Sequence, residues 1–126
     1  MVGHTGNLCA TICSMEALDL QLSRILPVID ELHGAAVITA DHGNADEMYE
    51  TDKKTGAPKA NKDGSLKSKT SHTLNPVPCI IYDNFSADKY TVKSGSFGLS
   101  NVAATTVNLL GYKAPEMWDE SVIEVK

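Results

Sequence analysis

The sequence predicts an α/β fold with a mainly parallel sheet. Residues 7–33 carry apolar side chains at helical spacing, and residues 100–111 show a second, shorter helical pattern. Two short apolar runs, at residues 35–40 and 79–82, are typical of buried strands. The order helix, strand, long loop, strand, helix indicates layers of helix packed on sheet.

The first helix is expected from about Asn7 to His33. Its apolar stripe steps by threes and fours, through Leu18, Leu22, Ile25, Ile29 and Leu32. We expect this stripe to face the core. Pro27 should kink the helix or divide it, because proline lacks a backbone donor and crowds the preceding turn. Gly34 is the expected C-cap.

The run "AAVITA", Ala35 to Ala40, predicts a strand that is covered on both faces. The run "NPVPCIIYD" predicts a second strand with its centre at Cys79 to Tyr82, and its two prolines lie on the approach, where they remove no central ladder bond. Two strands make a small sheet. We therefore expect this chain to be part of a sheet whose other strands are contributed by sequence elsewhere.

Between the strands, residues 46–71 are rich in Lys, Asp, Gly, Ser and Thr, which predicts a solvated loop or hairpin insertion. The later helix should begin after Ser100 as N-cap and stop at Gly111. It is expected to bury Val102, Ala103, Val107 and Leu110. The tail predicts a short final strand or a clamp.

Composition limits the function classes. The 126 residues have the length of one domain, and a formal net charge of −5 argues against a broad nucleic-acid or anionic-membrane surface. No apolar run approaches the roughly 20 residues that span a bilayer, and the first residues do not resemble a secretion signal. We therefore expect a cytoplasmic protein.

The three cysteines, Cys9, Cys13 and Cys79, are odd in number and match no zinc-ribbon or disulfide spacing. Cys9 and Cys13 lie one helical turn apart. We interpret all three as reduced, packed thiols, with a metal or redox role for the pair as the alternative.

Histidines at predicted strand and helix ends are the candidate site. Asp41 and His42 follow the first strand, where open α/β sheets bind ligands. His4 precedes the first helix and His72 precedes the second strand. Imidazole and carboxylate suit a divalent ion. The alternative is a turn aspartate with ordinary loop histidines; His33 suits the end of a helix dipole and is left out.

The segments "MVGHTGN", "ITADHGNAD" and "SHTLNPVP" resemble, in order, three signature segments of the cofactor-independent phosphoglycerate mutases of the alkaline phosphatase superfamily. "GLSNVAATTVNLLGY" resembles the closing helix of that family. The resemblance implies that residues 1–126 form the carboxyl-terminal part of a phosphatase-like metal-binding domain, in a three-layer α/β/α arrangement. It corresponds to about the last quarter of the family's chain.

That family interconverts 3-phosphoglycerate and 2-phosphoglycerate in glycolysis and gluconeogenesis, through a phosphoserine intermediate and two divalent ions. The resemblance implies that His4 and His72 are ligands of a first ion, and that Asp41 and His42 are ligands of a second. Manganese is expected, with magnesium, cobalt and zinc as alternatives. Paired ions of this kind hold a phosphoryl group and lower the pKa of a serine nucleophile.

The resemblance also implies what these residues lack. The nucleophilic serine, further aspartate ligands and the substrate-binding arginines and lysine belong to upstream segments, and Arg24, the single arginine, matches none of them. No catalytic or substrate-binding residue is therefore assigned in this chain. Phosphoglycerate is expected as a partner of the full-length enzyme, and the isolated chain is expected to be inactive.

Two other classes stay open. The chain is also consistent with a non-catalytic metal-binding or scaffold module, or with a piece of another enzyme of the superfamily, such as a phosphopentomutase or a sulfatase-like hydrolase. Because a piece of a larger sheet leaves a strand edge unpaired, self-association through that edge is a further expectation.

Overall fold

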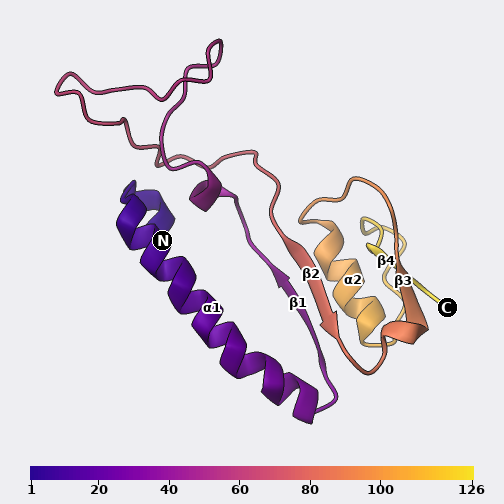
Figure 1. Ribbon diagram of the computed structural model, residues 1–126. Helices are drawn as coiled ribbons and strands as arrows, with labels where there is room; N and C mark the ends of the chain where they lie inside the picture. The colour runs from indigo at the N-terminus through magenta and orange to yellow at the C-terminus, as the bar shows by residue number, and fades with distance from the viewer. The chain divides into compact units, whose positions relative to one another are not determined.

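The computed structural model describes residues 1–126 (Figure 1). Its helices and strands are, in chain order, α1 (Leu8–Glu31), β1 (Ala35–Thr39), β2 (Cys79–Asp83), β3 (Tyr90–Val92), α2 (Asn101–Leu109) and β4 (Ile123–Val125). The chain forms two compact units. Unit 1 combines Met1–Ile25 with Ala40–Pro78, and unit 2 combines Leu26–Thr39 with Cys79–Lys126.

Helix α1 confirms the predicted first helix, and it continues through Pro27 instead of dividing there. Thr11 is its only buried residue, and several members of the apolar stripe are exposed, with Leu32 exposed to 77%. The expectation that this stripe packs in a core is therefore wrong for these residues. The chain contains one other α-helix, of 9 residues, and four short strands, which is too little to cover a helix of 24 residues. No helix combines the length and apolarity needed to cross a membrane.

The end of α1 differs from the expected glycine cap. His33, with a φ of 50°, is the residue in the left-handed conformation, and it precedes Gly34. The N–H of Gly34 donates to the carbonyl of Ile29 at 2.8 Å, which closes the last turn. The His33 ring packs on Phe85, with 4.3 Å between the ring centroids. This contact gives a physical reason for a non-glycine residue in a conformation that usually favours glycine.

Strands β1 and β2 lie side by side and run antiparallel, with Ala35 paired to Asp83 and Thr39 paired to Cys79 (Figure 1). The expectation of a mainly parallel sheet is therefore wrong for the strands of this chain. A parallel pair needs a crossover connection, usually a helix. Here α1 precedes β1 and α2 follows β2, so no helix lies between the paired strands. The expectation that the first strand is covered on both faces is wrong, because no residue of β1 is buried. The pair also has no third strand at either edge.

The rest of unit 2 is built around α2. Gly111 follows this helix with a φ of 83°, as predicted, but Ser100 makes no capping bond; the Asn101 side chain accepts the N–H of Gly98 at 2.7 Å instead. The tail forms β4, which pairs antiparallel with β3 and confirms the predicted final strand. The predicted burial of Ala103 and Leu110 is wrong, because the buried positions of α2 are Asn101, Ala104 and Thr105. The Asn101 amide donates to the carbonyl of Glu120, and the Thr105 hydroxyl accepts the N–H of Val122. These bonds to the tail place that face of the helix inward.

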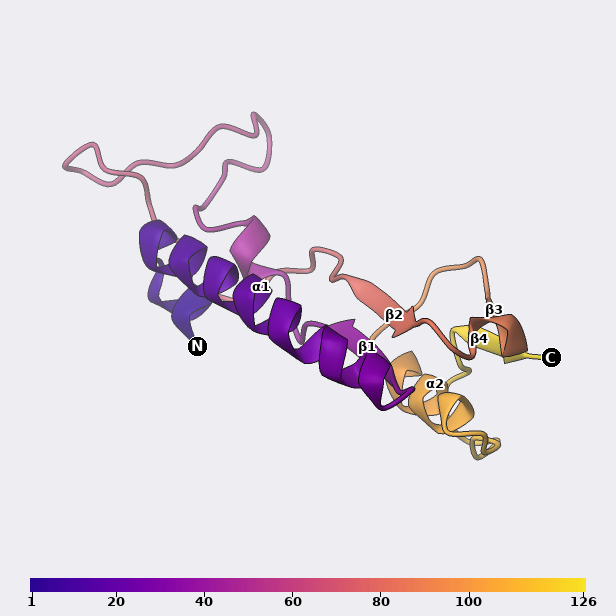
Figure 2. The ribbon, with the colours of Figure 1, turned by 60° about the horizontal axis from the view of Figure 1, so that its bottom comes forward.

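Residues 46–71 form a long excursion that Figures 1 and 2 show as an open, extended arm. Its two sides are joined by isolated bridges, such as Tyr49 with Ser68, and by single backbone hydrogen bonds, such as that from the N–H of Glu50 to the carbonyl of Lys67 at 2.8 Å. Within the arm, Lys67 and Lys59 lie 3.0 and 3.6 Å from the carboxylate of Glu50. The hydrogen bond from Lys67 lowers the pKa of Glu50 below its usual value. All three cysteine thiols are free and exposed, so the expectation that they are packed is wrong.

The end of α1 is tied to β2 within unit 2 by a polar contact. The Tyr82 hydroxyl donates to Asp30 at 2.6 Å, and the Asn84 amide donates to the other oxygen of the same carboxylate at 2.9 Å. The hydrogen bond to Asp30, with a smaller effect of burial, raises the pKa of Tyr82 above its usual value.

This contact gives the first prediction. A raised pKa means that the Tyr82–Asp30 bond stabilises the folded chain fully below the unfolded pKa of about 10, and that this stabilisation is lost as the pH rises through the folded pKa. We expect Tyr82→Phe to lower the free energy of unfolding at neutral pH, with the difference from the parent chain shrinking at strongly alkaline pH. Urea unfolding across that range measures it. Tyr112→Phe, at an exposed position, is the control, and an equal, pH-independent loss in both variants would contradict the prediction.

Candidate metal centre

The candidate site lies in unit 1, where three loop segments meet. The first is the 3-10 turn η1, Val2–Thr5, which carries His4 and ends at Gly6 in the left-handed conformation. A Cβ at Gly6 would lie 2.6 Å from the Cβ of Ser68, whose hydroxyl donates to the Gly6 carbonyl at 3.0 Å. Gly6 is therefore required both for its conformation and for the close approach of the returning arm.

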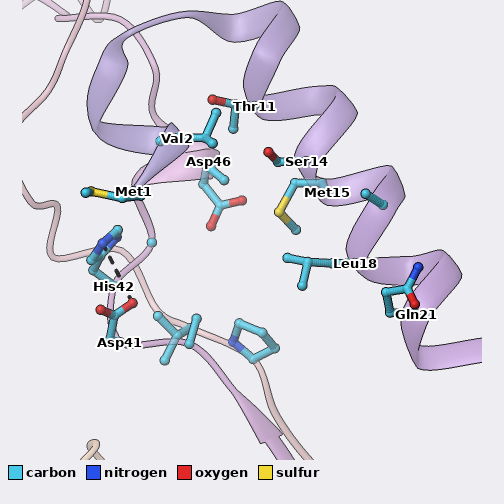
Figure 3. Close-up of a pocket in the computed structure, with 17 residues that line it drawn as sticks. Met1, Val2, Thr11, Ser14, Met15, Leu18, Gln21, Asp41, His42 and Asp46 are labelled. Carbon is cyan, nitrogen blue, oxygen red and sulfur yellow. Dashed lines mark ion pairs between the residues drawn. The ribbon is translucent and has the colours of Figure 1, made fainter. Parts of the chain in front are cut away.

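The second segment follows β1 and carries Asp41 and His42. It continues into a 3-10 turn, η2, Asn44–Asp46. The N–H of Asn44 donates to Nδ1 of His42 at 3.4 Å, a contact too long to fix the tautomer of the ring. An oxygen of the Asp41 carboxylate lies 3.7 Å from Nε2 of His42 (Figure 3). The Asp41 side chain is 89% exposed.

The third segment carries His72 between Ser71 and Thr73. The Asn44 side chain, which is 2% exposed, holds this segment: its oxygen accepts the N–H of Thr73 at 3.2 Å, and its nitrogen donates to the carbonyl of Ser71 at 3.1 Å. That nitrogen also lies 3.3 Å from Nδ1 of His4. One buried amide therefore contacts all three segments.

The three histidines form one cluster. A ligand nitrogen from each of His4, His42 and His72 lies within 4.8 Å of the other two. The ring centroids are 4.7 Å apart for His4 and His42, 5.0 Å for His4 and His72, and 4.6 Å for His42 and His72. His4 and His42 are half-buried and His72 is exposed, so the cluster has an open side.

The chemistry of this donor set fits a divalent ion. Nδ1 of His4 lies 3.0 Å from the carbonyl oxygen of Thr70, and because that oxygen can only accept, Nδ1 is assigned the proton. The lone pair of Nε2 is then free, as a metal ligand requires. A histidine ligand whose other nitrogen donates to a carbonyl is the usual arrangement in metal sites.

Of the predicted ligands, the structure brings the three histidines together and leaves Asp41 beside His42 at the rim. It does not separate them into the two expected pairs, His4 with His72 and Asp41 with His42, so that division stays a prediction. His33 lies in unit 2, against Phe85. Asn44 was not identified from the sequence, although its place directly after "ADHG" puts it next to two of the candidates.

A cavity of about 640 Å³ opens beside Asp41 and His42, within unit 1 (Figure 3). Residues of α1 line one side, among them Ser14, Met15, Leu18 and Gln21, and Met1 and Val2 of the N-terminal segment line another. Its wall is mainly apolar, and the charged groups are Asp41 and Asp46. Two of the candidate ligands, Asp41 and His42, therefore border a space large enough for a small molecule or for further protein side chains.

Comparison with known proteins defines the class. Residues 1–114 match the sequence model of the metalloenzyme superfamily. This match covers most of the chain, and the chain therefore belongs to the metalloenzyme superfamily. The resemblance recognised in the motifs is confirmed at this level.

Within that class, the chain is similar to 2,3-bisphosphoglycerate-independent phosphoglycerate mutases. It is 46% identical to the enzyme of Trypanosoma brucei brucei and 44% identical to enzyme 1 of Arabidopsis thaliana, in each case over 99% of this chain and 23% of the relative. A crystal structure of Leishmania mexicana phosphoglycerate mutase, determined at low cobalt concentration, superposes with a TM-score of 0.90 at 42% identity, covering 99% of this chain and 23% of that one. The chain thus spans about a quarter of the length of these relatives.

The approach of the segments predicts that Gly43 tolerates no side chain. A Cβ there would lie 2.9 Å from the Cβ of Asn75 and 3.1 Å from its carbonyl oxygen. We expect Gly43→Ala to lower the free energy of unfolding by about 1–3 kcal/mol, the usual cost of overpacking. Gly3→Ala is the matched control, because its Cβ would meet only the Asn44 Cβ, at 3.7 Å. Denaturant unfolding compares the two variants, and equal stabilities would show that the contact with Asn75 does not constrain residue 43.

Proposed function

We propose that this chain is the carboxyl-terminal, metal-binding part of a phosphoglycerate mutase that interconverts 3-phosphoglycerate and 2-phosphoglycerate at a two-ion centre. The observation that carries the proposal is the cluster of His4, His42 and His72, with ligand nitrogens within 4.8 Å. The similarity to the mutases, over 99% of the chain at up to 46% identity, supports the same assignment.

The proposed ligands are His4 and His72 for one ion, and Asp41 and His42 for the other. Imidazole and carboxylate together suit manganese, cobalt and zinc, and manganese is the proposed ion, with cobalt, zinc and magnesium as alternatives. Bound ions would polarise a phosphoryl group and lower the pKa of a hydroxyl nucleophile. The cobalt named for the Leishmania structure supports the proposal that a divalent ion is involved.

The residues of this chain would hold and orient the ions, and none of them would react with the substrate. The Thr70 carbonyl holds the His4 ring from its Nδ1 side, the Asn44 side chain packs against the same side, and the open side of the cluster leaves room for ligands from elsewhere. We assign no nucleophile and no substrate-binding residue in these 126 residues. The nucleophilic serine, the remaining ligands and the groups that bind phosphoglycerate are proposed to come from the part of the mutase that the chain does not span.

The surfaces of the chain agree with this proposal. Apolar side chains of α1, among them Leu18, Ile25 and Val28, are exposed, and β1 and β2 form only a two-stranded pair. We propose that the missing part of a three-layer α/β/α domain with a larger, mainly parallel sheet covers them. Residues 46–71 are proposed to be a solvated insertion in that domain. In the isolated chain the same surfaces would favour self-association, and a cytoplasmic location stays a prediction.

The metal centre gives a direct prediction. We expect the chain to bind Co²⁺ through these ligands, with His4 and His72 at one ion and His42 at the other, because neutral imidazole nitrogens are good ligands for it. His4→Ala, His42→Ala and His72→Ala should each weaken binding by at least about tenfold, through loss of a direct ligand. Calorimetric titration and the visible absorption of Co²⁺ measure both effects.

His33→Ala is the control for that titration, because His33 packs on Phe85 and is the one histidine outside the cluster. Its Co²⁺ affinity should equal that of the parent chain. If Co²⁺, Mn²⁺ and Zn²⁺ all fail to bind, the metal-binding proposal is wrong. The chain is then better interpreted as a non-catalytic scaffold module.

The activity proposal is tested separately. We expect no interconversion of phosphoglycerates by the isolated chain with Mn²⁺, because no nucleophile is assigned in it. In a full-length mutase carrying this segment, His72→Ala should lower kcat/KM by at least about a hundredfold through loss of an ion ligand. Turnover by the purified 126-residue chain, or full activity of the full-length variant, would overturn the proposal.

A further inference from the structure

We infer that Asn44 is the positioning residue of the histidine cluster: its buried amide sets the place of His72 relative to His4. This inference rests on the proposed metal-binding function and adds a residue that holds the ligands without contacting the ion. Asn44 is 2% exposed, and both ends of its amide are engaged with backbone groups on either side of His72.

The geometry of these two bonds constrains the backbone of His72. The amide oxygen of Asn44 accepts the N–H of Thr73 at 3.2 Å, and its nitrogen donates to the carbonyl of Ser71 at 3.1 Å. These are the groups on either side of residue 72, and a single planar amide satisfies both, as a neighbouring strand would. The His72 side chain is exposed, and the Asn44 amide bonds the backbone groups directly before and after it, while the next contact of the segment is that of the Thr70 carbonyl with His4.

Asn44 also lies against the other two ligands. Its side-chain nitrogen lies 3.3 Å from Nδ1 of His4, a packing contact because that Nδ1 donates to Thr70, and its backbone N–H lies 3.4 Å from Nδ1 of His42. Asn44 thereby contacts residues that lie 27 to 40 positions away from it in the chain. Removing the amide would leave the N–H of the buried Thr73 without a partner, which is costly, and would free the segment that carries His72.

A purely structural residue elsewhere in unit 1 gives the contrast. Asn61 lies in the arm, where its amide donates to the Ser65 hydroxyl at 2.9 Å, and its side chain is exposed. It contacts none of the three histidines. Asn61→Ala therefore removes an asparagine of the same kind without touching the cluster.

The test compares Asn44→Ala with Asn61→Ala in the 126-residue chain, first without metal. We expect Asn44→Ala to speed hydrogen exchange of the Thr73 amide by about fivefold or more, as the loss of one hydrogen bond predicts, and to shift and broaden the His72 ring signals in NMR spectra. Asn61→Ala should leave both unchanged. Asn44→Ser, whose hydroxyl can replace one of the two bonds, should give an intermediate effect and serves if the alanine variant does not fold.

With Co²⁺ added, Asn44→Ala should weaken binding by about 10–100-fold, the usual effect of losing a group that orients a ligand, and should alter the visible absorption of the bound ion. Unchanged Thr73 exchange and unchanged His72 signals in Asn44→Ala, or equal changes in Asn61→Ala, would overturn the inference. If the parent chain binds no Co²⁺, the proposed metal centre fails, and the metal-free measurements still decide the role of Asn44.

Discussion

The buried side chain of Asn44 is the contact on which unit 1 depends. Three loop segments, without regular pairing to one another, meet at it, and its amide makes two backbone hydrogen bonds that a sheet would otherwise supply. Buried backbone groups must find partners. A single residue with a donor and an acceptor in one plane can provide both for an extended segment, and this explains why loops, and not strands, can hold the histidines close together.

The two glycines beside this junction follow from the same constraint. Gly6 takes the left-handed conformation where it lies against Ser68. A Cβ on Gly43 would lie 2.9 Å from the Cβ of Asn75, so only glycine fits there without a shift. At both glycines the neighbouring segment lies too close for a Cβ to fit without a shift. The quoted motifs "GHTGN" and "ADHGN" therefore combine a ligand with a glycine, because the ligand reaches its position only where the backbone can come close.

Local patterns in the sequence predicted the elements well and their surroundings poorly. The stripe of α1 and the apolar run of β1 depend on near neighbours, so both elements were predicted to within about two residues. The relative direction of β1 and β2 depends on the path of the chain between them. The burial of the apolar stripe depends on which other segments cover the helix. Neither property is encoded in the local sequence. The histidines were predicted from their places at element ends. Asn44 was missed because its partners lie 27 to 40 residues away in sequence.

The base of the arm explains how a site divided by a long loop can stay assembled. His42 and His72 are separated by the whole excursion, yet its two sides are joined where it leaves unit 1: the N–H of Lys69 donates to the carbonyl of Met48 at 2.9 Å. Lys69 also pairs with Glu47 at 2.8 Å, and Met48 is buried at this point. Because loop-closure entropy grows only as the logarithm of length, each doubling of the arm costs about 0.6 kcal/mol. Closure at the base is therefore what the site requires, and the exposed tip is free to vary in length and sequence without moving His72 away from His42.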